Sequence, residues 1–290
     1  MKETEKNRVL PGTLYLVSTP IGNLADLSER AIKTLSEVDF VAAEDTRNSG
    51  LLLSRLGISR PMISYFEHNK RERGEEIAAR LQAGESCALV TDAGTPAVSD
   101  PGEDLVALCA SRGIRVSAVP GPVASIAALT LSGLPTGRFC FEGFLPPVKS
   151  KRIARLKELA GEKRTLLFHE APHKLSRTLD DLAAVFGGSR RIAICRELTK
   201  LNEEILRTTL EDAAARYKET EPRGEFVLVV EGAPDAAEQP ANQALPLAEQ
   251  VLKYEKEGLS RKDAIKRVAH ERNLPKNEVY QAILREEEQQ

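Results

Sequence analysis

Residues 86–102, "SCALVTDAGTPAVSDPG", set a short apolar run directly before a loop that is rich in glycine and proline. The apolar run predicts a buried strand, and the loop marks the carboxyl end of that strand. In open α/β sheets, ligands bind just outside the carboxyl ends of the strands. Comparable loops follow predicted strands at residues 17–24, 118–125 and 168–173.

These four loops predict a binding site that is built largely from main chain, because glycine lets the backbone approach a ligand and proline stiffens a loop. The alternative is that glycine and proline merely end each strand, which explains one loop better than it explains four. The chain has no GxxxxGK[ST] loop, no GxGxxG after its first strand and no GxSxG elbow. These absences count against a P-loop enzyme, a dinucleotide-binding protein, the common methyltransferase fingerprint and a hydrolase.

Strands alternate with helices on either side of the opening stretch, which predicts βαβ units and a mostly parallel sheet over residues 11–122. A second series over residues 123–233 contains strands that could pair antiparallel, so we expect a mixed sheet there. The polar run "APDAAEQPANQ", residues 233–243, marks a linker. Three helical patterns over residues 243–290 predict a small helix-turn-helix-like appendage. The predicted fold class is therefore α/β, with two domains and a C-terminal helical domain.

Composition limits the classes of partner. The 290 residues carry a formal net charge of only −2, so attraction to an anionic partner has to come from local clusters. Four scattered cysteines count against a disulfide framework or a zinc ribbon. We find no apolar run that is typical of a signal peptide or a membrane span, and we expect a soluble, cytoplasmic protein.

The string "HEAPH", residues 169–173, matches the zinc motif H-E-x-x-H. In that motif both histidines project from one helix face. Pro172 would cost an interior helix about 3 kcal/mol, whereas it fits the first turn of a helix that follows a strand. We therefore expect His169 at a strand end, His173 inside the next helix, and no metal.

Four segments resemble the tetrapyrrole methylase superfamily, and within it the branch that methylates small-subunit ribosomal RNA: "GTLYLVSTPIGNLADLSERA", "AEDTRNSGLLLSRLGI", "VTDAGTPAVSDPG" and "VPGPVASIAALTLSGLP". The resemblance runs from about Gly12 to Gly232, and the C-terminal helices resemble the helical extension of that branch. It implies a tetrapyrrole-methylase-like fold, a homodimer, and S-adenosylmethionine bound in the cleft between two α/β domains. By position, it implies that the cofactor is bound by Pro20, Asp92, Gly94, Thr95, Pro96, Val98, Ser99, Pro120, Gly121, Ser125 and Ala171. His169 stands where the family commonly has tyrosine.

The implied reaction is methyl transfer to the ribose 2′-hydroxyl of a cytidine in small-subunit rRNA. The protein has to align that hydroxyl and exclude water, and a base or an electrostatic partner would help because a ribose hydroxyl is a weak nucleophile. We expect Asp45, Arg47 and Asp26 to be the catalytic candidates. Glu44 is a further candidate for the base near the first two strand ends, with His68 beyond. Arg47 could hold a phosphate or fix Asp45, and an equally good alternative is that the Asp45–Arg47 pair only caps a helix.

Basic runs at residues 68–73 and 148–157 and in the C-terminal helices could neutralise phosphates and make RNA binding salt-dependent. As solvated helix faces they would do nothing special. The predicted RNA-binding residues are His68, Lys70, Arg71, Arg73, Lys149, Lys151, Arg152, Arg155, Lys262 and Lys266. Arg261, Arg267 and Lys276 could contribute to the same surface.

Two other functions remain open from the sequence. A methyltransferase of this fold could act on a tetrapyrrole or a protein side chain, although the basic runs and the extra helices argue against a small macrocycle. A ribosome-associated RNA-binding protein without turnover is the second alternative. The expected partners are small-subunit rRNA or the 30S subunit and a second copy of the chain, with neither membrane nor metal.

Overall fold

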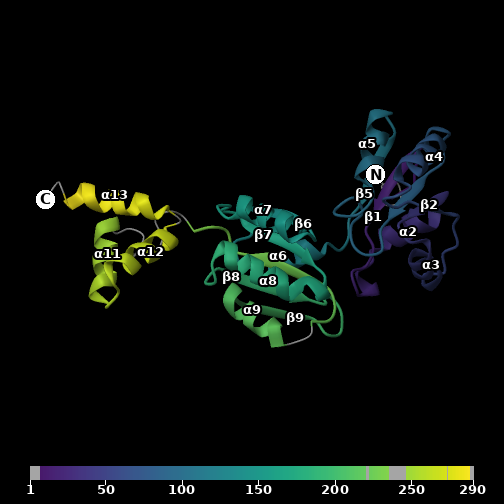
Figure 1. Cartoon of the computed structure of the whole chain (residues 1–290). Helices are drawn as coiled ribbons and strands as arrows, with labels where there is room; N and C mark the ends of the chain where they lie inside the picture. Colours follow the sequence, from purple (N-terminus) through teal and green to yellow (C-terminus); the bar gives the residue numbers. More distant parts are fainter. Residues whose placement is uncertain (1–6, 220–221, 235–245, 273, 288–290) are drawn as a thin grey trace. The chain divides into compact units, whose positions relative to one another are not determined.

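The computed structural model describes residues 7–219, 222–234, 246–272 and 274–287. The chain forms two compact units, Met1–Gly232 and Ala233–Gln290. Most of the predicted linker, residues 235–243, lies outside the described residues. The first unit contains two sheets (Figure 1). The domain boundary between residues 122 and 123 stays a prediction.

The first sheet is parallel throughout, in the order β3-β2-β4-β1-β5. Its strands are β1 (Thr13–Val17), β2 (Phe40–Ala43), β3 (Met62–Ser64), β4 (Cys87–Val90) and β5 (Arg115–Val119). Its helices are α2 (Glu29–Glu37), α3 (Thr46–Arg55), α4 (Lys70–Gln82) and α5 (Glu103–Ser111), with a short 3₁₀ turn, η1 (Leu24–Asp26). The prediction of a mostly parallel sheet is confirmed.

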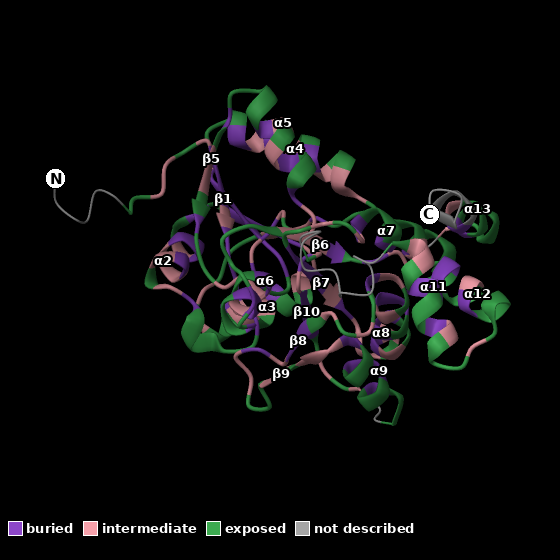
Figure 2. Ribbon diagram, turned by 90° about the vertical axis from the view of Figure 1, so that its left-hand side faces the viewer, coloured by how far each residue is buried: buried purple, intermediate pink, exposed green. Residues whose placement is uncertain are grey.

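Both faces of this sheet are buried, as expected of parallel strands covered by helices. Alternate residues point to opposite faces, so that Leu14 packs on the side of α4 and α5 and Tyr15 on the side of α2 and α3. Figure 2 shows the buried strands between these helix pairs. The sequence did not predict β3, a three-residue strand at the edge of the sheet with half-buried side chains.

The second sheet is mixed, as predicted, in the order β6-β7-β10-β8-β9. Its strands are β6 (Phe139–Phe144), β7 (Thr165–Glu170), β8 (Arg191–Arg196), β9 (Glu204–Thr209) and β10 (Phe226–Val230). Only β6 and β7 pair parallel, and the other pairs are antiparallel. One face packs against α6 (Ala124–Leu131) and the other against α7 (Lys149–Leu159), α8 (Pro172–Phe186) and α9 (Leu210–Glu219).

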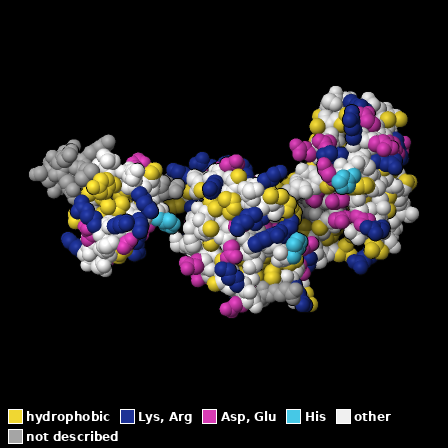
Figure 3. Space-filling model, viewed as in Figure 1, with side chains coloured by type: hydrophobic (Ala, Val, Ile, Leu, Met, Phe, Trp, Pro, Cys, Tyr) yellow, Lys and Arg dark blue, Asp and Glu magenta, His cyan; other side chains and the backbone are white. Residues whose placement is uncertain are grey.

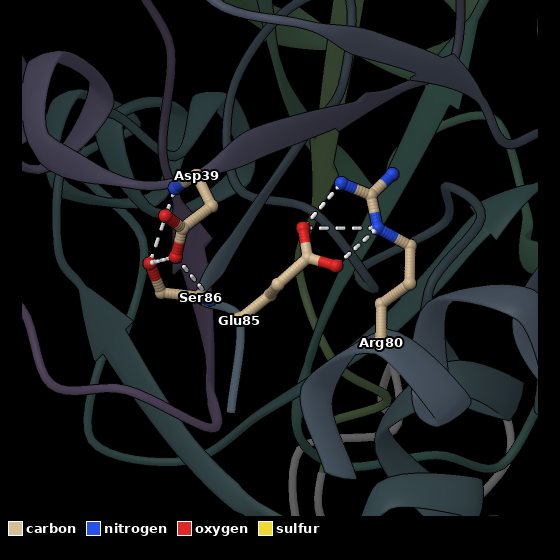
Figure 4. Close-up of polar contacts among 4 residues, drawn as sticks. All are labelled: Asp39, Arg80, Glu85 and Ser86. Carbon is tan, nitrogen blue, oxygen red and sulfur yellow. Dashed lines mark hydrogen bonds and ion pairs between the residues drawn. The ribbon is translucent and has the colours of Figure 1, made fainter. Parts of the chain in front are cut away.

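At the edge of the first sheet where β2 and β4 begin, the charged side chains pair with neighbouring groups (Figure 4). The Asp39 carboxylate accepts hydrogen bonds from the N–H and the hydroxyl of Ser86, both at 2.7 Å, and these bonds lower the pKa of Asp39. Arg80 pairs with Glu85 and lies 3.6 Å from the centre of the Phe40 ring. The contact between Asp39 and Ser86 joins the residues that precede β2 and β4.

The second unit consists of α11 (Leu247–Lys256), α12 (Arg261–Glu271) and α13 (Lys276–Glu287) around a small core. Ser260 caps α12 by accepting a hydrogen bond from the N–H of Asp263 at 3.2 Å. Arg267 lies over the Tyr254 ring at 4.5 Å and pairs with Glu271. No described helix in either unit combines the length and the apolar character that crossing a membrane requires.

Candidate functional site

Three of the predicted loops follow the neighbouring strands β4, β1 and β5 and are hydrogen-bonded to one another. Thr19 and Gly94 exchange backbone hydrogen bonds of 2.8 and 3.1 Å, which form an isolated antiparallel bridge. The hydroxyls of Ser18 and Thr95 share a hydrogen bond of 2.8 Å, and the Thr95 hydroxyl donates to the Pro122 carbonyl at 3.2 Å. The loops therefore form one rigid backbone surface at the carboxyl edge of the sheet.

A cavity of about 300 Å³ opens beside these loops, within the range of roughly 300–1,000 Å³ that is usual for small-molecule sites. The first sheet contributes the residues after β2 and β4, and the second sheet contributes the ends of β6, β7 and β8. The start of β10 lies there too, because Phe226 pairs with Glu170 and Arg196. The lining includes Glu44, Asp92, Val98, Ser99, Asp100, Phe144, His169, Leu198, Glu225 and Phe226.

The wall from the first sheet is acidic. Glu44 accepts a hydrogen bond from the Thr91 hydroxyl at 2.7 Å, and Asp92 accepts one from the Asn48 amide at 3.0 Å. Burial and the nearby Glu44 raise the pKa of Asp100 to about 6. Within the described residues no Lys or Arg forms an ion pair with these three carboxylates, so this wall suits a cationic group of a ligand.

The opposite wall is aromatic. His169 lies edge-on to Phe141 and Phe144, with ring centres 5.2 and 5.5 Å apart. Its Nε2 atom is buried without a hydrogen-bond partner in the described structure, and burial lowers the pKa of His169, which favours the neutral ring. A planar heteroaromatic group that has a hydrogen-bonding edge fits this wall.

The turn after β8 packs against the loop that follows β1. The Lys200 ammonium pairs with Glu197 and Glu225, both at 2.9 Å, and a Cβ atom added at Gly22 would lie 2.4 Å from the Lys200 Cγ. Glu197 and Thr199 have positive φ angles of 52° and 65°. Such strained residues cluster at ligand sites. Sequence reasoning missed this turn because "RELTK" contains no glycine or proline to signal it.

Some of the predicted cofactor-binding residues line the cavity, and others support the residues that line it. Asp92, Val98 and Ser99 line it. Behind them, Gly94 and Thr95 join the loops, and Gly121 packs so tightly that an added Cβ would lie 2.8 Å from the Ser18 Cβ. The remaining predicted residues belong to the same loops or to the helices that follow them: Pro20, Pro96, Pro120, Ser125 and Ala171. Asp100, Phe144 and Glu225 were not predicted, although Asp100 lies inside the opening stretch.

Asp45 caps α3 and pairs with Arg47, and a catalytic role for this pair stays a prediction. The Asp45 side chain accepts the Arg47 N–H at 2.8 Å as the cap of α3 and pairs with the Arg47 guanidinium at 2.7 Å. This guanidinium lowers the pKa of Asp45 to about 2, which makes the carboxylate a weak proton acceptor at neutral pH. The Arg47 side chain is 88% exposed, and Asp26 lies exposed in η1.

The zinc-like string adopts the predicted arrangement. His169 belongs to β7, and Pro172 occupies the first turn of α8, so the two histidines do not share a helix face. Across the ranges that the structure describes, no group of three or more His, Cys, Asp or Glu residues is placed to hold a metal ion.

The structure corrects the prediction that Arg152 contacts RNA. Arg152 is only 4% exposed, and its guanidinium pairs with Asp181 at 2.6 Å and donates to the Pro147 carbonyl at 3.1 Å. The run that contains it has no acid of its own, but the packing of α7 against α8 supplies one. Arg152 is therefore part of the core and is not available to a phosphate.

Other predicted RNA contacts are tied to acids at the surface. Lys70 pairs with Glu67 and Asp104, Arg73 with Glu76, and Arg155 with Glu142 and Glu158. Arg71, Lys149 and Lys151 are exposed, and none of them forms an ion pair within the described residues. RNA contact by all these residues stays a prediction.

A parallel sheet and a mixed sheet that share a cleft at their strand ends define a two-sheet α/β ligand-binding protein. Residues 13–214 match the family of Tetrapyrrole (Corrin/Porphyrin) Methylases. Uroporphyrin-III C-methyltransferase from Thermus thermophilus, solved with S-adenosylhomocysteine, has the same fold: TM-score 0.53 and 19% identity, over 76% of this chain and 97% of that one.

Two relatives are much more similar in sequence, and both are named ribosomal RNA small subunit methyltransferase I. The protein from Synechocystis sp. is 47% identical over 94% of this chain and 98% of its own length. The protein from Xylella fastidiosa is 51% identical over 78% of this chain and 83% of its own length. The chain belongs to the tetrapyrrole methylase family and, within it, to the ribosomal RNA small subunit methyltransferase I family. It is a methyltransferase that uses S-adenosylmethionine.

Proposed function

We propose that this protein methylates the ribose 2′-hydroxyl of a cytidine in small-subunit rRNA, with the cofactor bound in the cleft between the two sheets. The observation that carries the proposal is the near full-length match to the Synechocystis relative, 47% identical over 98% of that protein. A homodimer and contact with rRNA through Arg71, Lys149 and Lys151 are parts of the same proposal.

The two walls of the cleft fit the two ends of S-adenosylmethionine, which supplies a methyl group activated by a positively charged sulfur. The carboxylates of Glu44, Asp92 and Asp100 face the cationic part. The aromatic wall takes the adenine ring, and the unpartnered Nε2 of His169 offers a hydrogen bond to its edge. The loops joined at Gly94 fix this arrangement and exclude water.

The acids of the site differ in what they can do with a proton. Asp100, with a pKa of about 6, is the carboxylate best suited to accept the proton that the ribose hydroxyl releases. Asp45, with a pKa of about 2, is better suited to position Arg47, whose exposed guanidinium can meet a substrate phosphate. Asp26 remains a catalytic candidate, and its side chain is exposed in η1.

Cells that lack this protein are expected to lose ribose methylation at a cytidine of the small-subunit rRNA. Mapping 2′-O-methyl groups along that rRNA, with and without the gene, measures the loss directly. Re-expression of the wild-type chain should restore the modification. An unchanged map of 2′-O-methyl groups would contradict the proposed substrate. If the cells instead lose a methyl group from a base or from a protein, that base or protein is the substrate.

Asp100→Asn is expected to reduce the preference for S-adenosylmethionine over S-adenosylhomocysteine about tenfold, because one carboxylate no longer attracts the sulfonium charge. In the wild type the preference should rise as pH increases from 5 to 7, since the raised pKa of about 6 means that Asp100 ionises in this range. Calorimetry with both ligands at pH 5 and pH 8 tests both statements. Glu103→Gln, which removes an exposed charge outside the cavity lining, is the control. If the Asp100 variant has the same ratio of affinities for the two ligands as the wild type, Asp100 does not belong to the cofactor site.

A further inference from the structure

The helical unit contains an open groove of about 460 Å³ between the first halves of α12 and α13. Ile265 and the ring of Tyr280 give the groove an apolar floor, and Tyr280 is 49% exposed. Four cations surround this floor: Arg261, Lys262, Lys266 and Lys276. Figure 3 shows hydrophobic side chains beside Lys and Arg side chains on this unit.

The charged side chains that line this groove are all positive. Lys266 lies 3.2 Å from the Asp263 carboxylate, whereas Lys262 and Lys276 make no ion pair within the described residues. The residues that line the groove, all of them among those described, include no acid.

Three other hollows of the protein have acidic residues in their lining. The hollow between α4 and α5 sets Lys70 and Arg71 against Glu75 and Asp104. The hollow near the start of β2 sets Arg8 and Lys33 against Glu37 and Asp39, and the cofactor cleft is acidic. A cationic rim around an exposed aromatic ring is the combination that single-stranded nucleic acids recognise, because phosphates pair with the cations and a base stacks on the ring.

We propose that the groove between α12 and α13 binds a single-stranded segment of RNA, with a base stacked on Tyr280 and the neighbouring phosphates held by Lys262, Lys266 and Lys276. This proposal rests on the proposed function, since it assigns a second contact to the same rRNA substrate. The core residues Ala264, Val268, Val279 and Ile283 hold the two helices together beneath the groove. The lysines and Tyr280 are exposed, so they can be changed without disturbing that core.

The lysines are tested in the full-length protein with a fluorescent single-stranded RNA that copies part of the small-subunit rRNA. Lys262→Glu/Lys276→Glu is expected to weaken binding at least tenfold and to reduce the slope of log K against log salt by about 1.4, or about 0.7 for each phosphate that is no longer neutralised. Lys253→Glu/Lys256→Glu on α11 makes the same change of charge outside the groove and serves as the matched control. If both double variants weaken binding equally, the groove is not a specific site.

Tyr280 is tested separately because stacking depends on the ring. Tyr280→Ala is expected to weaken RNA binding about tenfold, whereas Tyr280→Phe should stay within about twofold of the wild type. Equal losses in both variants, or no loss in either, would overturn the stacking role. Variants that bind RNA normally but fail to bind the assembled subunit would assign the groove to a ribosomal protein and overturn the proposal.

Affinity for S-adenosylmethionine separates this proposal from the proposed function. The groove variants should bind the cofactor as the wild type does and should raise the KM for rRNA while kcat changes little. A wild type that binds this RNA through the groove, in cells whose map of rRNA ribose methylation does not change when the gene is removed, would contradict the proposed function alone. A wild type that methylates rRNA with unchanged KM in the groove variants would contradict the groove alone.

Discussion

Gly94→Val is expected to weaken the binding of S-adenosylmethionine about 100-fold or more while the protein stays folded. Gly94 has a φ of +88°, a conformation that a β-branched residue does not adopt without strain of about 1–3 kcal/mol. We expect the loop to relieve this strain by breaking the backbone bridge to Thr19. That bridge joins the loops after β1 and β4, so the surface that faces the cofactor would change shape. Calorimetry with the cofactor measures the loss.

Gly84→Val is the matched control for this prediction. Gly84 has a similar φ of +98°, and a Cβ atom added there meets nothing within 4 Å. It lies in the turn between α4 and β4, at the opposite edge of the sheet from the cleft. The control should lose stability through backbone strain but keep its cofactor affinity. If both variants bind the cofactor equally, the joined loops do not determine its binding.

The cleft between the two sheets was predictable from the sequence to the extent that local patterns determine it. A strand that ends in glycine and proline marks its own carboxyl end, and parallel strands bring such ends to one edge. That logic found Asp92, Val98 and Ser99 in the cavity lining. It could not show that β4, β1 and β5 are neighbours, because strand order depends on the packing of helices over the whole sheet.

The features that the sequence missed depend on partners far along the chain. β9 is an edge strand with half-buried side chains, so its sequence "EILRTT" carries no strong apolar alternation. Phe144 and Glu225 reach the cavity only because β6 and β10 belong to a sheet whose order was not predicted. The basic run of α7 looked uniform in sequence, yet folding buries Arg152 and leaves Lys149 and Lys151 exposed. Periodicity cannot reveal the acid on another helix that makes such burial possible.

Asp181→Ala is expected to lower the free energy of unfolding by about 3–5 kcal/mol, because it leaves the Arg152 guanidinium buried without its carboxylate. Asp181 is 8% exposed, accepts a hydrogen bond from the Arg152 Nε at 2.8 Å and forms an ion pair with the Arg152 Nη2 at 2.6 Å. Urea denaturation measures the loss. Arg155→Ala on the exposed face of α7, where the side chain is 43% exposed, is the control and should cost about 1 kcal/mol or less.

Replacing both residues of the Arg152–Asp181 ion pair distinguishes a core role for Arg152 from an RNA-binding role. Arg152→Met/Asp181→Leu should recover most of the stability that Asp181→Ala loses, since apolar side chains of similar size can replace a buried ion pair. If Arg152 belongs to the core, this double variant should bind RNA with the affinity and the salt slope of the wild type. Lys149→Glu/Lys151→Glu, on the same helix but exposed, should reduce both. A loss of RNA affinity in the stable Arg152→Met/Asp181→Leu variant would instead mean that the helix opens to expose Arg152 when RNA binds.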